Sequence, residues 1–332
     1  MINNFYMNKQ RLKIGLKILA AIGLLGWFLY KSDVGKIFEN IYNLPFKVFA
    51  SAVILNFFYL AIKTLRWHLL LPKFSPKKLL QLSFISQFYS IFSAGQFVGE
   101  AAKIYILGKG QKEAGQIAMS VLIDKITGTI GLVIVALFGL VFTPTILPSG
   151  LIWTFIAAVI ICLISIFSIR FQPVYNFLIN LFNRLHNRFL RFKRMISRLT
   201  RLIEAWHIYS KKTGIIFMSI ILSIIFQLIL VGVYMIMSYG LGINISFLDW
   251  CWVLGILSGI LVLPVTIGGL GLREGSLVGL LGFFLIAKES ALALSFSIFG
   301  LQLIFAVVGG AIELKRTGLL NFKIEKINTN LC

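Results

Sequence analysis

Gly95-Gln-Phe-Val-Gly-Glu100 and Gly269-Leu-Gly-Leu-Arg-Glu274 are the two segments that decide the predicted fold. Each interrupts a hydrophobic stretch with glycines, then places a glutamate, and is followed by Lys-Glu and a long apolar run. The chain has only 11 acidic residues, so two glutamates in matching apolar positions require a reason. Glycine-interrupted hydrophobic segments at corresponding places in two halves are typical of transporter binding sites. The pattern predicts a translocation site built from two broken helices.

The composition around these segments is that of a membrane protein. Hydrophobic residues make up 58% of the 332 residues, and charged residues make up 13%. A soluble fold cannot bury that much apolar surface, so we expect an all-α, polytopic helical membrane protein. The net charge of +21 fits a positive-inside bias and an anionic leaflet better than a nucleic-acid partner. We interpret Cys162, Cys251 and Cys332 as small hydrophobes, without a disulfide or metal role.

Apolar length predicts about eight spans together with broken or re-entrant helices. Stretches long enough to cross the membrane lie at 14–30, 46–62, 114–142, 151–169, 214–240, 248–266 and 290–312. Two weaker segments, 79–110 and 268–286, contain the glycine–glutamate patterns. The part of the first that follows Glu100 is too short to cross a core of about 30 Å. We therefore expect 79–110 to form a re-entrant hairpin or a pair of half-helices.

The distribution of Lys and Arg predicts the orientation in a cytoplasmic (cell) membrane. Basic residues gather before the first span, in the 170–212 loop and in the C-terminal tail, which places both termini in the cytoplasm. The uncharged loop at 143–150 is then outside. Residues 1–332 are predicted to form one integral membrane domain, with repeat motifs at 79–142 and 248–312. These motifs have opposite orientations, as inverted repeats do.

The 170–212 segment contains ten Lys or Arg residues and one acid, Glu204. Apolar side chains recur at helical spacing from Val174 to Trp206, with a second stripe of arginines. This predicts one amphipathic helix on the cytoplasmic membrane surface. It serves either as a topology anchor, the favoured interpretation, or to recruit anionic lipid headgroups.

Ionisable side chains inside apolar sequence cost a few kcal/mol each on insertion scales and are candidates for function. They occur here as acid–base neighbours: Glu100 with Lys103, Asp124 with Lys125, and Arg273 with Glu274. The alternative is that each pair neutralises itself and fixes helix packing without touching a substrate.

Glycines beside these charges would let a ligand approach backbone N–H groups. The glycines are Gly95, Gly99, Gly269 and Gly271. Helix N-termini after Gly99 and Gly271 would favour a phosphate, and a neighbouring lysine or arginine would pair with it. Arg66, at the predicted end of a span, is expected to extend to the membrane interface.

Three runs carry a family resemblance. They are Gly95-Gln-Phe-Val-Gly-Glu-Ala-Ala-Lys-Ile-Tyr-Ile-Leu107, Ser120-Val-Leu-Ile-Asp-Lys-Ile-Thr-Gly128 and Gly268-Gly-Leu-Gly-Leu-Arg-Glu-Gly275. In this order they resemble the lysylphosphatidylglycerol synthase transmembrane, or flippase-like, domain family over about residues 10–316. The resemblance implies a lipid flippase role for Glu100, Lys103, Asp124, Lys125, Arg273 and Glu274. The family usually has arginine at the positions of Lys103 and Lys125, and lysine lacks the bidentate fork.

We therefore expect a flippase for a lipid with an anionic headgroup or a polyprenyl-linked intermediate, without a cofactor. Bifunctional relatives carry an aminoacyltransferase domain after the spans, whereas this chain ends about twenty residues past the last one, so no lysyltransferase activity is expected. One alternative is a membrane scaffold for a separately encoded lipid-modifying enzyme or glycosyltransferase. Another is a proton-coupled small-solute transporter with Glu100 and Glu274 as proton sites.

Overall fold

The computed structural model describes residues 23–24, 26–92, 96–109, 113–143, 150, 153, 157, 164, 167–188, 193–262, 266 and 268–317. Within these ranges the chain is helical and no strand occurs, so the all-α prediction is confirmed. The helices are α2 (Val34–Tyr42), α3 (Phe46–Leu70), α4 (Pro76–Phe92), α5 (Gln96–Gly108), α6 (Ala114–Phe142), α8 (Gln172–Arg188), α9 (Lys193–Ser210), α10 (Thr213–Gly240), α11 (Phe247–Leu261), α12 (Leu272–Gly282) and α13 (Lys288–Arg316).

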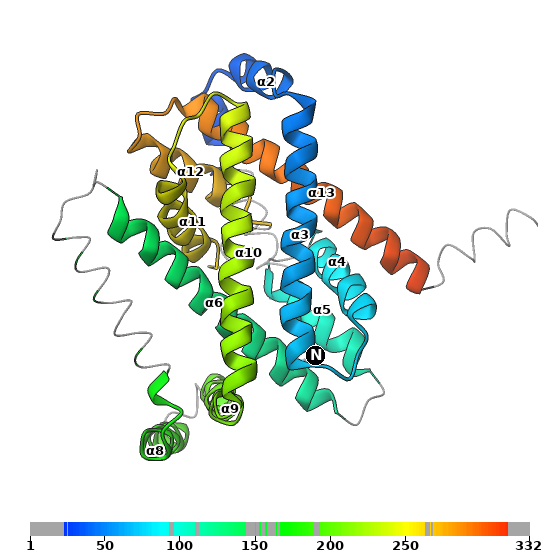
Figure 1. Ribbon diagram of the computed structural model, residues 1–332, viewed down its shortest axis with the longest axis vertical. Helices are drawn as coiled ribbons and strands as arrows, with labels where there is room; N and C mark the ends of the chain where they lie inside the picture. The colour runs from blue at the N-terminus through cyan, green and yellow to red at the C-terminus, as the bar shows by residue number, and fades with distance from the viewer. Residues whose placement is uncertain are drawn as a thin grey trace, which may run out of the picture.

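Helices α3–α6 and α10–α13 form two units with the same order of elements. Each unit has a long helix, two shorter ones and a final helix of 29 residues. Helices α3 and α10 lie side by side and run in opposite directions, and α6 and α13, which are not neighbours, also run in opposite directions (Figure 1). The second helix of each unit packs against the last helix of the other: α4 on α13, and α11 on α6. This order and these contacts are the arrangement expected of inverted repeats, with α3 and α10 lying outside the predicted motif ranges 79–142 and 248–312.

Four of the described helices, α3, α6, α10 and α13, are long and apolar enough to cross a membrane. The expected span at 248–266 is wrong, because α11 ends at Leu261 after 15 residues, about 22 Å, and the chain then turns. The expected span at 46–62 is too short, because α3 continues to Leu70. The expected spans at 14–30 and 151–169 lie mostly outside the described residues.

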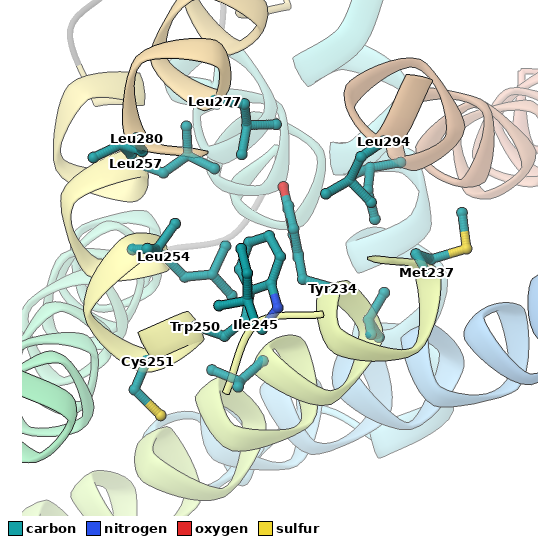
Figure 2. Close-up of a cluster of buried hydrophobic side chains, with 14 of the residues drawn as sticks. Tyr234, Met237, Ile245, Trp250, Cys251, Leu254, Leu257, Leu277, Leu280 and Leu294 are labelled. Carbon is teal, nitrogen blue, oxygen red and sulfur yellow. The ribbon is translucent and has the colours of Figure 1, made fainter. Parts of the chain in front are cut away.

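The largest hydrophobic core joins α10, α11, α12 and α13, with further side chains from α3 and α6. Figure 2 shows its centre, where Trp250 and Leu254 of α11 face Tyr234 of α10 and the leucines of α12 and α13 lie beyond. Cys251 is buried and free within this core, which confirms its interpretation as a small hydrophobe. Cys162 and Cys332 lie outside the described residues.

Glycines allow the helices of the two units to approach closely. A β-carbon at Gly309 of α13 would collide with the backbone of Phe84 in α4. In the matching contact, a β-carbon at Gly139 of α6 would collide with the backbone of Leu248 in α11. Small residues at helix crossings are the usual means of tight packing in membranes. Glycines thus allow close packing at both of these contacts between the units.

The single amphipathic helix predicted from Val174 to Trp206 is wrong. The chain forms two helices, α8 and α9, that pack against each other. The His207 ring near the end of α9 stacks on Tyr175 near the start of α8, with ring centroids 4.1 Å apart. Trp206 is buried in a cluster with side chains of α6 and α10, so α9 packs on protein. Both helices lie at the end of the molecule where α10 begins (Figure 1).

Candidate functional site

The first broken segment is a hairpin of α4 and α5, as predicted for 79–110. The turn between them, which includes Gly95, lies outside the described residues. The sequence predicted a helix N-terminus directly after Gly99. This prediction is wrong, because Gly99 lies inside α5. Its missing side chain makes room for α4, because a β-carbon there would collide with the backbone oxygen of Ser86 and the hydroxyl of Ser90. Gly99 therefore serves close packing within the hairpin and does not expose N–H groups to a ligand.

The second broken segment pairs α11 with α12. Gly268, Gly269 and Gly271 have φ of 62°, 76° and 81°, a region that favours glycine, and they turn the chain into α12. A β-carbon at Gly268 would lie 3.2 Å from the carbonyl oxygen of Ile91, near the end of α4. The turn of the second hairpin therefore lies against the end of the first, between the two units.

A cavity of about 480 Å³ lies where these two hairpins meet. Its walls come from α3, α4, α5, α6, α10, α11, α12 and α13, together with the turn before α12. The basic side chains that line it are Lys63, Arg66, Lys103, Lys125 and Arg273. The acidic ones are Glu100 and Asp124. Counting Glu274 as well, which pairs with Arg273, five bases face three acids, so the site carries an excess of positive charge.

Arg66 is part of this site and does not extend to the membrane interface, which corrects the expectation for it. Its Nε lies 2.7 Å from Asp124 Oδ1, and its Nη1 donates to the Ser223 hydroxyl at 2.7 Å. The guanidinium also lies over the Phe226 ring, 4.8 Å from its centroid. Asp124 thus pairs with Arg66 of α3 as well as being the sequence neighbour of Lys125. This pair joins α3 and α6 and is almost completely buried.

The sequence contains a pattern that indicates an inward-facing position for Arg66, and the prediction of membrane spans did not use it. Asn56, Tyr59, Lys63 and Arg66 lie at spacings of three, four and three, so they form one polar stripe on the otherwise apolar α3. All four line the cavity. A polar stripe along a spanning helix indicates a face that looks into the protein interior.

Glu100 and Lys103 form the second pair, on one face of α5. Lys103 Nζ lies 3.1 Å from Glu100 Oε2, and it sits 4.9 Å from the centroid of the Trp67 ring. Glu100 keeps 19% of its side chain exposed, against 4% for Lys103, so the carboxylate is the more accessible partner. Lys63 and Lys125 line the same cavity. Three lysines and one carboxylate therefore gather at the first hairpin.

Arg273 and Glu274 form the third pair, and the two residues have different positions. Arg273 lines the cavity and donates to Gln302 of α13 at 3.2 Å. Glu274 is fully buried, and its carboxylate accepts hydrogen bonds from Arg273 at 2.8 Å, from the Ser295 hydroxyl at 2.9 Å and from the Gly271 N–H at 2.5 Å. The N-terminus of α12, expected to attract a phosphate, is thus capped by the protein's own carboxylate.

Of the predicted site residues, six line one cavity: Glu100, Lys103, Asp124, Lys125, Gly269 and Arg273. Gly99, Gly271 and Glu274 are not among the residues that line the cavity, and they stabilise the packing of the two hairpins. In addition to Lys63 and Arg66, sequence reasoning missed two buried amides that line the cavity, Asn56 and Gln227.

Charge is distributed unequally between the two units. Aligning Glu100 with Glu274 also aligns the first residue of α6 with that of α13. Under this alignment, Lys103, Asp124 and Lys125 correspond to Leu277, Ile298 and Phe299. The first unit therefore supplies most of the charge, and the second supplies Arg273 and a largely apolar wall.

Comparison with known proteins identifies the family. The family model described as the lysylphosphatidylglycerol synthase TM region matches residues 14–310. No curated protein and no solved structure matches the chain. The match covers most of the chain, and the long apolar helices agree with a multi-pass membrane protein of lipid-related function. The chain therefore belongs to the lysylphosphatidylglycerol synthase transmembrane-region family.

Proposed function

We propose that this protein moves a lipid with an anionic headgroup between the leaflets of the cytoplasmic membrane. The observation that carries the proposal is the cavity between the two inverted units, in which basic side chains outnumber acidic ones. Buried cations are costly unless something compensates them, and a phosphate is a natural partner for lysine and arginine. The headgroup would enter this cavity while its acyl chains stay in the bilayer.

The two hairpins support a transport role over a purely structural one. Helices α4, α5, α11 and α12 are each 17 residues or shorter, and Gly268 and Gly269 before α12 line the cavity between the long helices. Irregular backbone at that depth is tolerated where it is covered by protein or lines a polar cavity. Inverted units around a central site are the usual architecture for alternating access.

The proposal also assigns the orientation of the protein in the membrane and separates lipid transport from lipid modification. The end that carries α8 and α9 faces the cytoplasm, because its basic residues follow the positive-inside rule. The chain binds and moves lipid and is not itself an enzyme. A separately encoded lipid-modifying enzyme or glycosyltransferase would supply its substrate.

The test is leaflet exchange in proteoliposomes containing acyl-labelled phosphatidylglycerol or phosphatidylcholine. We expect the purified protein to accelerate exchange of the anionic lipid well above that of the zwitterionic one. Lys125→Gln should slow it by about tenfold, because a hydrogen bond to a charged group contributes about 1.5–3 kcal/mol. The matched control is Lys73→Gln, which removes an exposed lysine paired with Glu113 outside the cavity.

Exchange at the rate of protein-free vesicles, by protein that retains its folded state, would contradict the proposal and favour the scaffold. Proton-dependent uptake of a small solute without lipid exchange would favour the third alternative.

A further inference from the structure

Two carboxamide side chains in the cavity do not fit a site for phosphate alone. Asn56 of α3 and Gln227 of α10 both line the cavity and are only 7% and 9% exposed. Within the described part of the chain, neither amide group makes a hydrogen bond to another side chain or to the backbone. Buried polar groups without partners are costly, most of all at membrane depth. Because both amides line the cavity, their donors and acceptors are available to a molecule bound there.

The structural explanation for such amides is a hydrogen bond between helices. Helices α3 and α10 do pack together, but they are joined by other groups, such as Arg66 with Ser223. The amides instead face the cavity. Each carboxamide offers two N–H donors and one accepting oxygen, without charge. That set matches hydroxyl groups, which both donate and accept, better than it matches a phosphate.

The amides lie next to the lysines in an ordered arrangement. Seven residues separate Asn56 from Lys63 on one face of α3, a rise of about 10 Å. Helix α10 runs antiparallel to α3, and two contacts show how the helices align along their length. Ser223 accepts a hydrogen bond from Arg66, and Gly232 lies beside Leu55. Gln227 thus falls between these two contacts, close to Lys63. Uncharged amides and the lysine cluster therefore line the same cavity.

Further neutral polar side chains line other parts of the cavity. Tyr234 of α10 and Ser86, Gln87 and Ser90 of α4 also line it. We propose that the cavity is built for a polyhydroxylated phosphate headgroup, with the phosphate at Lys63, Lys103 and Lys125 and the hydroxyl groups at Asn56 and Gln227. This rests on the proposed function and names its substrate class. A headgroup with an added amine would be disfavoured by the excess of basic side chains.

The test compares headgroups that share the phosphate and differ in hydroxyl groups. Exchange of acyl-labelled phosphatidylinositol and phosphatidic acid is measured in proteoliposomes of otherwise identical composition. The wild-type protein should prefer phosphatidylinositol. Asn56→Leu and Gln227→Leu should each slow phosphatidylinositol by about two- to tenfold, the effect of one neutral hydrogen bond, and leave phosphatidic acid unchanged. Gln116→Leu, an exposed amide on α6 outside the cavity, is the matched control.

The outcomes separate this inference from the function on which it rests. Equal wild-type rates for both lipids would overturn the inference and leave anionic lipid transport standing. Absence of exchange for either lipid would overturn both. Equal slowing of both lipids by the leucine variants would assign the amides to helix packing and contradict the subsite. The same comparison between polyprenyl phosphate and its hexose ester tells whether a glycerolipid or a polyprenyl carrier presents the headgroup.

Discussion

At the scale of single residues, the Arg66–Asp124 pair shows what one sequence can and cannot predict. The pairing of acidic and basic neighbours in the sequence predicted Asp124 as a charged residue within an apolar segment. It did not find the second partner of Asp124, because Arg66 is 58 residues away and meets Asp124 only when α3 packs on α6. Local spacing predicts pairs such as Glu100 with Lys103, which are one helical turn apart.

The buried pair makes a prediction about stability. Asp124→Asn should lower the free energy of unfolding by about 3–5 kcal/mol, because it leaves the Arg66 guanidinium buried without a compensating charge. Lys73→Gln should change it by about 0–1 kcal/mol, since Lys73 and Glu113 are largely exposed. Thermal unfolding of the two variants in detergent measures the difference. Equal stability would show that the Arg66 charge is compensated elsewhere.

The two motif glutamates should behave differently, although their sequence patterns match. Glu274→Gln should destabilise the protein by about 3 kcal/mol or more, because Glu274 is fully buried and neutralises Arg273. Glu100→Gln should cost less stability, since Glu100 faces the cavity, but it should slow lipid exchange by releasing Lys103 from its position. Unfolding curves and exchange rates at matched protein levels separate the two effects. Identical profiles for both variants would contradict the division of roles.

At the scale of elements, glycine interruptions together with segment length predicted the first hairpin, whereas apolar length did not predict the end of α11. The pair α4–α5 was expected because the segment after Glu100 is too short to span. The end of α11 was missed because residues 248–266 remain apolar beyond Leu261, and hydropathy does not register a turn. The fold-back of α8 and α9 was missed for a related reason. Helical periodicity continues along the sequence from Val174 to Trp206, whereas the contact of His207 with Tyr175 is tertiary.

Packing between α4 and α13 gives a prediction at this scale. Gly309→Ala should destabilise the protein by about 1–3 kcal/mol, because its methyl group would collide with the backbone of Phe84. Gly300→Ala in the same helix should be neutral or slightly stabilising, since no atom lies within 4 Å of its β-carbon position. Thermal unfolding compares the two. A tolerated Gly309→Ala would mean that α4 and α13 separate easily and would weaken the packing described for the two units.

At the scale of the whole molecule, the basic α8–α9 end and the α2 end lie at opposite ends of the long helices (Figure 1). In a cysteine-free background, a cysteine at exposed Arg184 should be protected from an impermeant reagent applied to intact cells. A cysteine at exposed Glu39 of α2 should be labelled. Permeabilised cells should show labelling at both sites. Labelling at Arg184 but not at Glu39 in intact cells would reverse the proposed orientation.

The central claim is that positive charge in the cavity between the two units binds an anionic headgroup during transport. The most direct measurement is the rate of phosphatidylglycerol exchange by folded Lys63→Arg, Lys63→Gln and Lys63→Glu proteins in proteoliposomes. Lys63 lines the cavity from α3. We expect the arginine variant to remain close to wild type, the glutamine variant to fall about tenfold and the glutamate variant to fall further. Wild-type exchange by all three variants would contradict the claim.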